Sequence, residues 1–327
     1  MTKYSKKIKV FYNDAQAIDS NVGFSKSPNK PKLLLQFLKK NKLMNNFHMV
    51  SDFKPFSKKD FHTAHTEEYV NNFFLGTGNC GSNGLSWNKE FAKSVTYTNA
   101  SLYNAIKHSI LNPKDICFSP TSGFHHARPN GGAGFCTFSG QVIASVKLYN
   151  EFGMKGAYLD LDGHYGNSIE DSREFVKTKD GLTLNDILPR DCNINPSGHG
   201  KTYLMSLKIH LKNLSVKLLN GEVNYVVACS GADSLVDDDL GGHLNYSDWV
   251  KAKNLIYKTV KKCSEILGRP IPLTISLFGG YRGDHYDSVL DAHTRDLLEC
   301  MNVLQEKSEP SKNYIKVYKF KRSGLSY

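Results

Sequence analysis

The chain has 327 residues, enough for one large domain or two small ones and for a substantial hydrophobic core. Hydrophobic residues make up 40% of it and charged residues 22%, which is the balance of an ordinary soluble globular protein. No apolar run approaches the roughly 18 residues that a membrane span needs. The basic N-terminus lacks the apolar core of a signal peptide. We therefore expect a globular protein with no membrane partner.

The net charge is +11, and basic residues gather in segments 6–9 and 316–322. We interpret these segments as solvated strand edges and a tail. No zinc-finger spacing or other nucleic-acid-binding module occurs, so nucleic acid is not the expected partner. The seven cysteines are odd in number and form no CxxC pair. They predict reduced, mostly buried thiols and a cytoplasmic protein.

Strand-like apolar runs alternate with helical patterns along the whole chain. The expected strands cover residues 8–12, 47–53, 115–118, 157–161, 224–229 and 273–278. The expected helices cover residues 31–40, 66–74, 91–111, 140–151, 201–219, 246–267 and 288–304. This alternation predicts an α/β fold with a mostly parallel sheet between two helical layers. No long linker or repeat divides it, so we expect a single domain over residues 1–327.

Four of the expected strands run directly into polar residues of types that can bind a metal or take part in catalysis. In chain order these residues are His125, His126, Asp162, His164, Asp233 and Tyr281. In folds with parallel sheets, ligand sites lie at the carboxyl ends of the strands. The sequence therefore predicts one site at this edge of the sheet.

Asp160, Asp162 and His164 occupy alternate positions, which share one face of an extended strand. Carboxylates and imidazole are ligands for a divalent cation such as Zn²⁺. Asp162, His164 and Asp233 form a plausible set of three ligands, which leaves a position open for water and substrate. Asp160 could orient an imidazole from behind. The alternative is a solvated strand end in which Asp233 only caps a turn.

The pair His125-His126 is weak evidence by itself, because paired histidines are more often structural than catalytic. It gains interest from Gly123 and from the glycine-rich loop 130–134, which let backbone and substrate approach closely. Two adjacent imidazoles can share acid and base roles near neutral pH. Tyr281 follows two glycines, and a phenol in such a bend can donate to a developing oxyanion. Its alternative is an exposed turn tyrosine.

The chain carries five motifs in a fixed order: SGFHHA, GAGFC, the DxDxH segment followed by Gly166-Asn167, the GAD strand end and the GGY turn. Taken together, these motifs resemble the histone deacetylase superfamily. Residues 64–70 resemble its segment near the N-terminus, and the resemblance covers about residues 60–305. It implies a three-layer α/β/α domain of the arginase/deacetylase type, with a mostly parallel sheet of about eight strands.

The resemblance also implies roles. Asp162, His164 and Asp233 would bind Zn²⁺, or Fe²⁺ as in some members. His126 would be the general base and later the acid, His125 would assist electrostatically, and Tyr281 would donate to the oxyanion. Asp160 would orient His125, and Asn167 would be the partner of His126. A substrate channel would be lined by Gly134, Phe135 and Gly280. A K⁺ ion could bind near Asp160 and Asp162.

The chain departs from the family pattern at several positions. Tyr165 stands where many members have a second histidine, and Asp239 replaces the usual proline. Asn167 stands where some members carry Asp and others Asn, which should make His126 less basic than an Asp partner would. Segment 174–193, where the family places the opposite channel wall, does not align. The acidic run 237–239 is either a solvated turn or an acidic rim that attracts cationic substrates.

These features predict a zinc-dependent amidohydrolase that removes an acetyl or similar acyl group from an amine. An acetylated lysine in a protein is the first substrate class, and an acetylpolyamine or another small amide is the alternative. A catalytically silent acyl-binding or scaffold protein is a third hypothesis. The two-metal arginases share the fold, but no carboxylate follows His164 at their expected spacing, which favours a single metal.

Overall fold

The computed structural model describes residues 3–19, 24–121 and 123–305. Within these ranges the strands form one seven-stranded sheet in the order β2-β1-β3-β7-β6-β4-β5. Every neighbouring pair of strands is parallel. The strands are β1 (Ile8–Phe11), β2 (Phe47–Val50), β3 (Cys117–Ser119), β4 (Gly156–Asp160), β5 (Asn193–Ile194), β6 (Tyr225–Ser230) and β7 (Leu273–Leu277).

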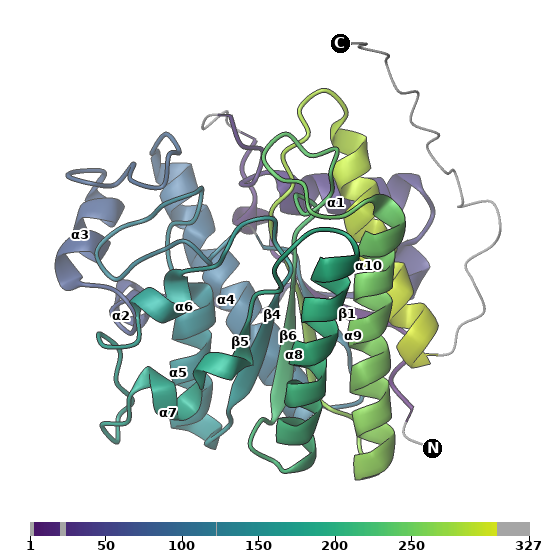
Figure 1. Cartoon of the computed structure of the whole chain (residues 1–327). Coiled ribbons are helices and arrows are strands. Elements are labelled where there is room, and N and C mark those ends of the chain that lie inside the picture. Colours follow the sequence, from purple (N-terminus) through teal and green to yellow (C-terminus); the bar gives the residue numbers. More distant parts are fainter. Residues whose placement is uncertain (1–2, 20–23, 122, 306–327) are drawn as a thin grey trace.

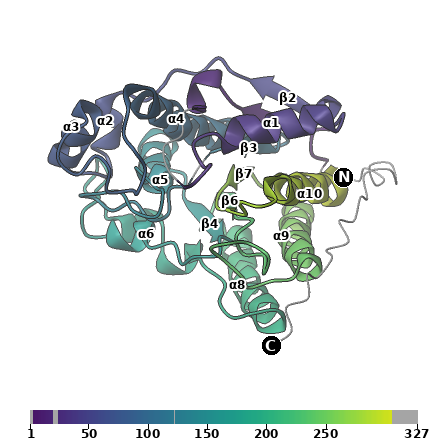
Figure 2. The same cartoon turned by 90° about the horizontal axis from the view of Figure 1, so that it is seen from above.

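Helices cover both faces of this sheet (Figures 1 and 2). The helices α8, α9 and α10 pack side by side, with α1 beside α10, and α4 and α5 lie on the opposite face. The long helices are α1 (Lys30–Lys40), α3 (Glu67–Leu75), α4 (Lys89–Leu111), α5 (Gly140–Phe152), α8 (Lys201–Leu219), α9 (Tyr246–Leu267) and α10 (Tyr286–Gln305). The short ones are α2 (Lys58–Phe61), α6 (Ser168–Asp171) and α7 (Leu184–Ile187), with three 3-10 turns at Asp14–Gln16, Met44–Asn46 and Arg190–Cys192.

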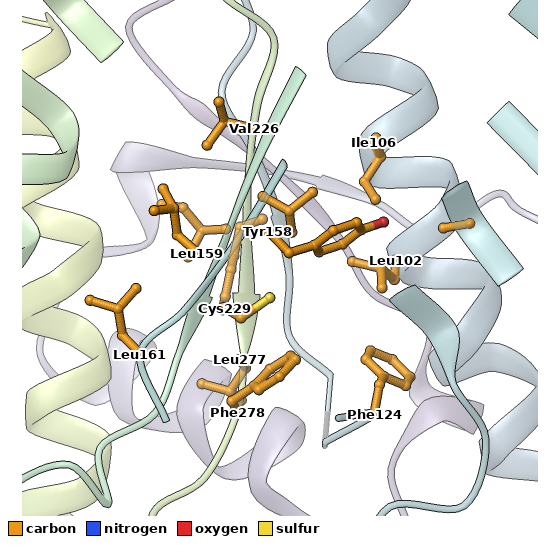
Figure 3. Close-up of a cluster of buried hydrophobic side chains, with 14 of the residues drawn as sticks. Leu102, Ile106, Phe124, Tyr158, Leu159, Leu161, Val226, Cys229, Leu277 and Phe278 are labelled. Atoms are coloured by element: carbon orange, nitrogen blue, oxygen red, sulfur yellow. The ribbon is translucent and has the colours of Figure 1, made fainter. Parts of the chain in front are cut away.

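The central strands are mostly apolar because they are covered on both faces. Every residue of β4, β6 and β7 is buried. In Figure 3 the side chain of Tyr158 on β4 points toward Leu102 of α4, whereas the side chains of Leu159 and Val226 lie on the other side of the strands. The phenol of Tyr158 donates to the carbonyl of Gln141 on α5. This core holds the carboxyl ends of the central strands rigidly in register.

Local signals explain where the helices begin and end. The side chain of Asn245 accepts from the backbone N–H of Asp248 and caps α9. Gly268 ends α9 and Gly153 ends α5 in left-handed conformations that glycine adopts without strain. These stops set the length of each helix and return the chain to the sheet.

The fold confirms the predicted α/β class and the three-layer arrangement. The predicted helices 201–219 and 246–267 coincide with α8 and α9, and the other predicted elements differ by a few residues at their ends. The resemblance implied about eight strands, whereas the described residues form seven, one of them a two-residue β5 that begins at the end of the unaligned segment 174–193. A single domain over 1–327 stays a prediction, and the basic run 316–322 lies outside the described residues.

Two further expectations can be checked against the structure. All seven cysteines are free, and six of them are buried. Among the described residues, no helix is both long and apolar enough to cross a membrane.

Candidate active site

The predicted site residues come together at the carboxyl edge of four adjacent strands. In sheet order these are β3, β7, β6 and β4. The loop after β3 carries His125 and His126, the turn after β7 carries Tyr281, and Asp233 follows β6. Asp160 is the last residue of β4, and the segment after it carries Asp162, His164 and Asn167. Four chain segments far apart in sequence thus meet because their strands are neighbours.

Asp162, His164 and Asp233 form the candidate metal centre. One ligand atom of each lies within 4.8 Å of the others. Nδ1 of His164 lies 3.1 Å from Oδ1 of Asp162 and 3.0 Å from Oδ2 of Asp233. This is the only such cluster of three or more ligand residues in the described ranges. The three ligands predicted from the sequence are therefore brought to one point.

The prediction that Asp160, Asp162 and His164 share one face of a strand is wrong. The strand ends at Asp160, whose sheet partner is Cys229, and residues 162–164 form a bend. Asp160 turns to His125, while Asp162 and His164 turn to Asp233. A turn through Gly163, rather than strand alternation, makes the two ligands converge.

The electrostatics of this cluster fit a divalent cation. Both carboxylates are almost completely buried. Burial raises the pKa of Asp233, and the neighbouring Asp162 raises it further. Burial also opposes ionisation of Asp162, but His125 and His164 outweigh it and hold its pKa well below the usual value. Oδ1 of Asp233 is buried without a hydrogen-bond partner. Two close carboxylates with an unsatisfied oxygen and an imidazole are a donor set that a cation such as Zn²⁺ would complete.

Glycines pack tightly around Asp233. A Cβ built on any one of four glycines would lie 1.5–2.7 Å from an atom of Asp233, which no real side chain can do. These four are Gly163, Gly231, Gly241 and Gly279. Because these four residues have no side chains, three loops can pack against the backbone and the carboxylate of Asp233. The GG pairs at 241–242 and 279–280 therefore each place one glycine against the candidate metal centre.

His125 is held at the inner end of the site. Its Nδ1 lies 2.9 Å from Oδ2 of Asp160, and its Nε2 lies 3.6 Å from Oδ1 of Asp162. Burial alone would lower the pKa of His125, but the carboxylates of Asp160 and Asp162 raise it to about 9. These carboxylates therefore favour the charged form of His125 at neutral pH. The predicted contact between Asp160 and His125 is present.

His126 faces the other way and is less buried. Its Nδ1 lies 2.8 Å from Oδ1 of Asn167, so the predicted pairing with Asn167 is also present. Burial lowers the pKa of His126, and the nearby charge of His125 lowers it further. The imidazole rings of His126 and His164 are 6.0 Å apart, centre to centre. His126 is therefore a neutral imidazole beside the metal centre.

Tyr281 projects over the same point. Its ring lies 6.5 Å from that of His164 and 5.5 Å from that of Phe135. Burial raises its pKa well above the ordinary value, so the phenol keeps its proton and can donate it in a hydrogen bond. The backbone N–H of Gly279, two residues earlier, donates to Oδ2 of Asp162 at 2.8 Å. Residues 279–283, which we call the tyrosine turn, are thus bound directly to Asp162 of the candidate metal centre.

The predicted channel residues differ in what they contact: Gly134 and Phe135 lie against His126 and Tyr281, whereas Gly280 is buried in the turn before Tyr281. Phe135 is half-buried against Tyr281 and has an unusual φ of 61°, and Gly134 before it has a φ of 48°. A Cβ on Gly134 would lie 2.5 Å from the ring of His126, so only glycine fits there. Gly280 is buried between Val289 and Ala232. What the structure shows for Gly280 is a place in the tyrosine turn, and its channel role stays a prediction.

The acidic run 237–239 lies beside the turn that carries Tyr281, and its role as an acidic rim stays a prediction. Oδ2 of Asp238 accepts from the backbone N–H of Tyr281 at 2.7 Å, and Oδ2 of Asp239 accepts from that of Gly283 at 2.8 Å. Two of the three carboxylates therefore hold the tyrosine turn. Asp239, which departs from the family pattern, thus has a structural contact of its own with Gly283.

Segment 174–193 folds into α7, the turn Arg190–Cys192 and the start of β5. It is tied together by Glu170, which accepts from Arg173, Arg190 and Asn193 at 2.7–2.9 Å. Next to the site the side chain of His164 is 37% exposed and Tyr165 is 61% exposed. The site is accordingly open on the side of these two residues.

Sequence reasoning missed Lys30. This lysine begins α1 and is fully buried, with its ammonium donating to the carbonyl of Phe278 and lying 5.5 Å from the ring centre of Tyr281. Burial lowers its pKa to about 8, although the carboxylates of Asp233 and Asp162 favour its charged form. No sequence signal separates Lys30 from the other lysines of this basic region.

This arrangement of ligands, histidines and tyrosine on a parallel sheet matches a known family. The family model of the histone deacetylase domain matches residues 25–297, and the chain belongs to this family. The match confirms the resemblance that the motifs indicated.

Individual relatives are more distant. Histone deacetylase B of Dictyostelium discoideum is 26% identical over 251 residues, which cover 68% of this chain and 54% of that protein. Histone deacetylase 8 of Xenopus laevis is 24% identical over 169 residues, which cover 49% of this chain and 51% of that protein. The chain thus spans about half the length of the curated relatives it matches.

A solved structure, the HD domain of HDA15, superposes with a TM-score of 0.68. The superposition covers 94% of this chain and 92% of that one, at 13% sequence identity. At this identity the likeness establishes the shared fold.

Proposed function

We propose that this protein is a metal-dependent deacetylase that hydrolyses the amide of an acetylated amine, with acetyl-lysine in a protein as the first substrate class. The observation that carries the proposal is the convergence of a three-ligand cluster, a neutral histidine and a protonated tyrosine on one point. Amide hydrolysis needs a polarised carbonyl, an activated water and a proton for the departing amine. Each of these needs has a group at this point.

Asp162, His164 and Asp233 would hold the ion, for which Zn²⁺ is our choice and Fe²⁺ the alternative. When bound, the ion supplies a Lewis acid that polarises the carbonyl and lowers the pKa of water. His126 takes a proton from water through Nε2, because Nδ1 is occupied by Asn167. It later returns that proton to the leaving amine. Tyr281 donates to the oxyanion, and the charged His125 stabilises negative charge from behind.

The test measures acetate release by Zn²⁺-loaded protein from an acetyl-lysine peptide and from acetylputrescine, side by side. Faster peptide turnover supports a protein deacetylase, and faster acetylputrescine turnover supports a small-molecule amidohydrolase. Release from neither substrate would contradict the proposal and favour a silent acyl-binding protein.

Two variants locate the chemistry. Tyr281→Phe should lower turnover about 100-fold or more while the metal stays bound, since one oxyanion donor is lost. Asp233→Ala should lose the metal, as measured by metal analysis of the purified protein. Unchanged turnover in the first variant, or a stoichiometric metal in the second, would contradict the respective role.

A further inference from the structure

Two hydrogen bonds in series link His126 to the carboxylate of Asp171, which also pairs with Arg128. Nδ1 of His126 lies 2.8 Å from Oδ1 of Asn167, and the side-chain Nδ2 of Asn167 donates to Oδ2 of Asp171 at 2.6 Å. The same Oδ2 lies 3.3 Å from Nε of Arg128. Asn167 and Asp171 stand one helical turn apart at the two ends of α6, where the backbone N–H of Asp171 donates to the carbonyl of Asn167.

We propose that Asp171 is a positioning residue that sets the orientation of the Asn167 amide and, through it, the tautomer of His126. This proposal rests on the proposed function of His126 as the base.

The argument begins with the asymmetry of an amide. The Asn167 side chain has an oxygen that only accepts and a nitrogen that only donates, and the two ends can exchange by a flip. A carboxylate only accepts, so Asp171 must face the NH₂ group. The oxygen of Asn167 is then left to face His126.

The orientation of the amide decides where His126 carries its proton. With the oxygen facing it, Nδ1 of a neutral imidazole must carry the hydrogen, and Nε2 keeps its lone pair. With the amide flipped, Nδ1 would have to accept, and the hydrogen would move to Nε2. A histidine protonated at Nε2 cannot take a proton from water there. Asp171 therefore keeps His126 in the form that can act as a base.

Arg128 offers a competing explanation, because it lies two residues after His126. The pair Arg128–Asp171 could simply tie the histidine loop to α6. Both side chains are substantially exposed, at 61% for Arg128 and 38% for Asp171, and exposed ion pairs contribute little to stability. Arg128→Gln is therefore the matched control, because it removes this tie and leaves the contact between Asn167 and Asp171 intact.

The kinetic test compares the effect of one substitution, Asp171→Ala, in two backgrounds: the wild-type protein and the Asn167→Asp variant. Asp171→Ala should lower kcat about tenfold with KM unchanged, the usual size for loss of an orienting partner. In an Asn167→Asp background the same change should cost nothing, because the two oxygens of a carboxylate are equivalent and need no orientation. Arg128→Gln should leave kcat unchanged in both backgrounds. An equal loss from Asp171→Ala in both backgrounds, or an equal loss from Arg128→Gln, would overturn the proposal.

A second measurement needs no substrate. The ¹⁵N–¹H correlations of the histidine side chains report which ring nitrogen carries hydrogen, and the signals of His126 are identified by their loss in His126→Gln. In the Zn²⁺-loaded protein they should show the Nδ1–H form, and in Asp171→Ala a mixture of both tautomers. An unchanged tautomer in Asp171→Ala would overturn the proposal. Because this spectrum is independent of turnover, a failure of the deacetylase function is distinguishable from a failure of the Asp171 role.

Discussion

His125 and His126 are neighbours in the chain, yet they belong to two different regions of the site. At the inner end His125 is buried with a carboxylate partner, Asp160, and is held in its charged form. At the mouth His126 is partly exposed with an amide partner, Asn167, and is held in its neutral form. The difference shows that the partner and the burial of a histidine, more than its position in the sequence, determine what it can do.

The largest expected effect is the loss of catalysis when His126 is replaced. His126→Ala should lower kcat/KM by about 10²–10⁴-fold, the usual contribution of a general acid–base group. Metal content should stay stoichiometric, because His126 is outside the ligand cluster. The measurement is acetate release with parallel metal analysis. Retained turnover would remove the functional contrast between the two histidines.

The next effect is on stability at the inner end. Asp160→Asn removes the partner of a buried imidazolium and should lower the free energy of unfolding at pH 7 by about 3–5 kcal/mol, measured by urea denaturation.

Asp115→Asn is the control, because Asp115 pairs with His108 at the same distance of 2.9 Å but with side chains 17% and 29% exposed. It should lose about 1 kcal/mol or less. Equal losses in Asp160→Asn and Asp115→Asn would show that burial does not separate the two pairs.

A smaller effect is expected under the tyrosine turn. Lys30→Met leaves the buried carbonyl of Phe278 without its donor and should cost about 1–3 kcal/mol, measured by urea denaturation. It should also lower kcat, because Tyr281 follows this carbonyl by three residues.

Lys26→Met is its control, since Lys26 is exposed and its ammonium lies over the ring of Tyr286. That variant should change stability by less than about 1 kcal/mol. A Lys26→Met effect as large as that of Lys30→Met would argue against a specific role for the buried lysine.

The smallest effect concerns pH. A base must be deprotonated to act, and a lowered pKa keeps His126 deprotonated as the pH falls below the usual 6.5. The acidic limb of kcat/KM should therefore lie below pH 6.5. The measurement is a pH–rate profile with metal content determined at each pH. A limb above 6.5 with the metal retained would mean that the titrating base is not this buried imidazole.

The sequence was sufficient for the architecture because a parallel sheet covered on both faces requires continuous apolar strands. The runs 224–229 and 273–278 were found for this reason, and they fall on β6 and β7. The same periodicity could not find β5, whose two residues are too few to show a pattern.

Residue types and their positions at strand ends were enough to predict which residues form the candidate site. Asp162, His164 and Asp233 were identified because they follow strands whose carboxyl ends meet at one edge. The reason for their convergence was wrong, since the chain bends after Asp160 and no local pattern encodes that bend.

What the sequence by itself determined is the sheet, the helical layers and the chemical groups at the carboxyl edge. Periodicity and motif spacing are properties of short segments and can be read locally. Only the tertiary structure decided that Lys30 is buried below the tyrosine turn, that Asp238 and Asp239 hold that turn, and that Asp171 stands behind Asn167. These contacts depend on how loops from different strands pack against one another, which no single segment specifies.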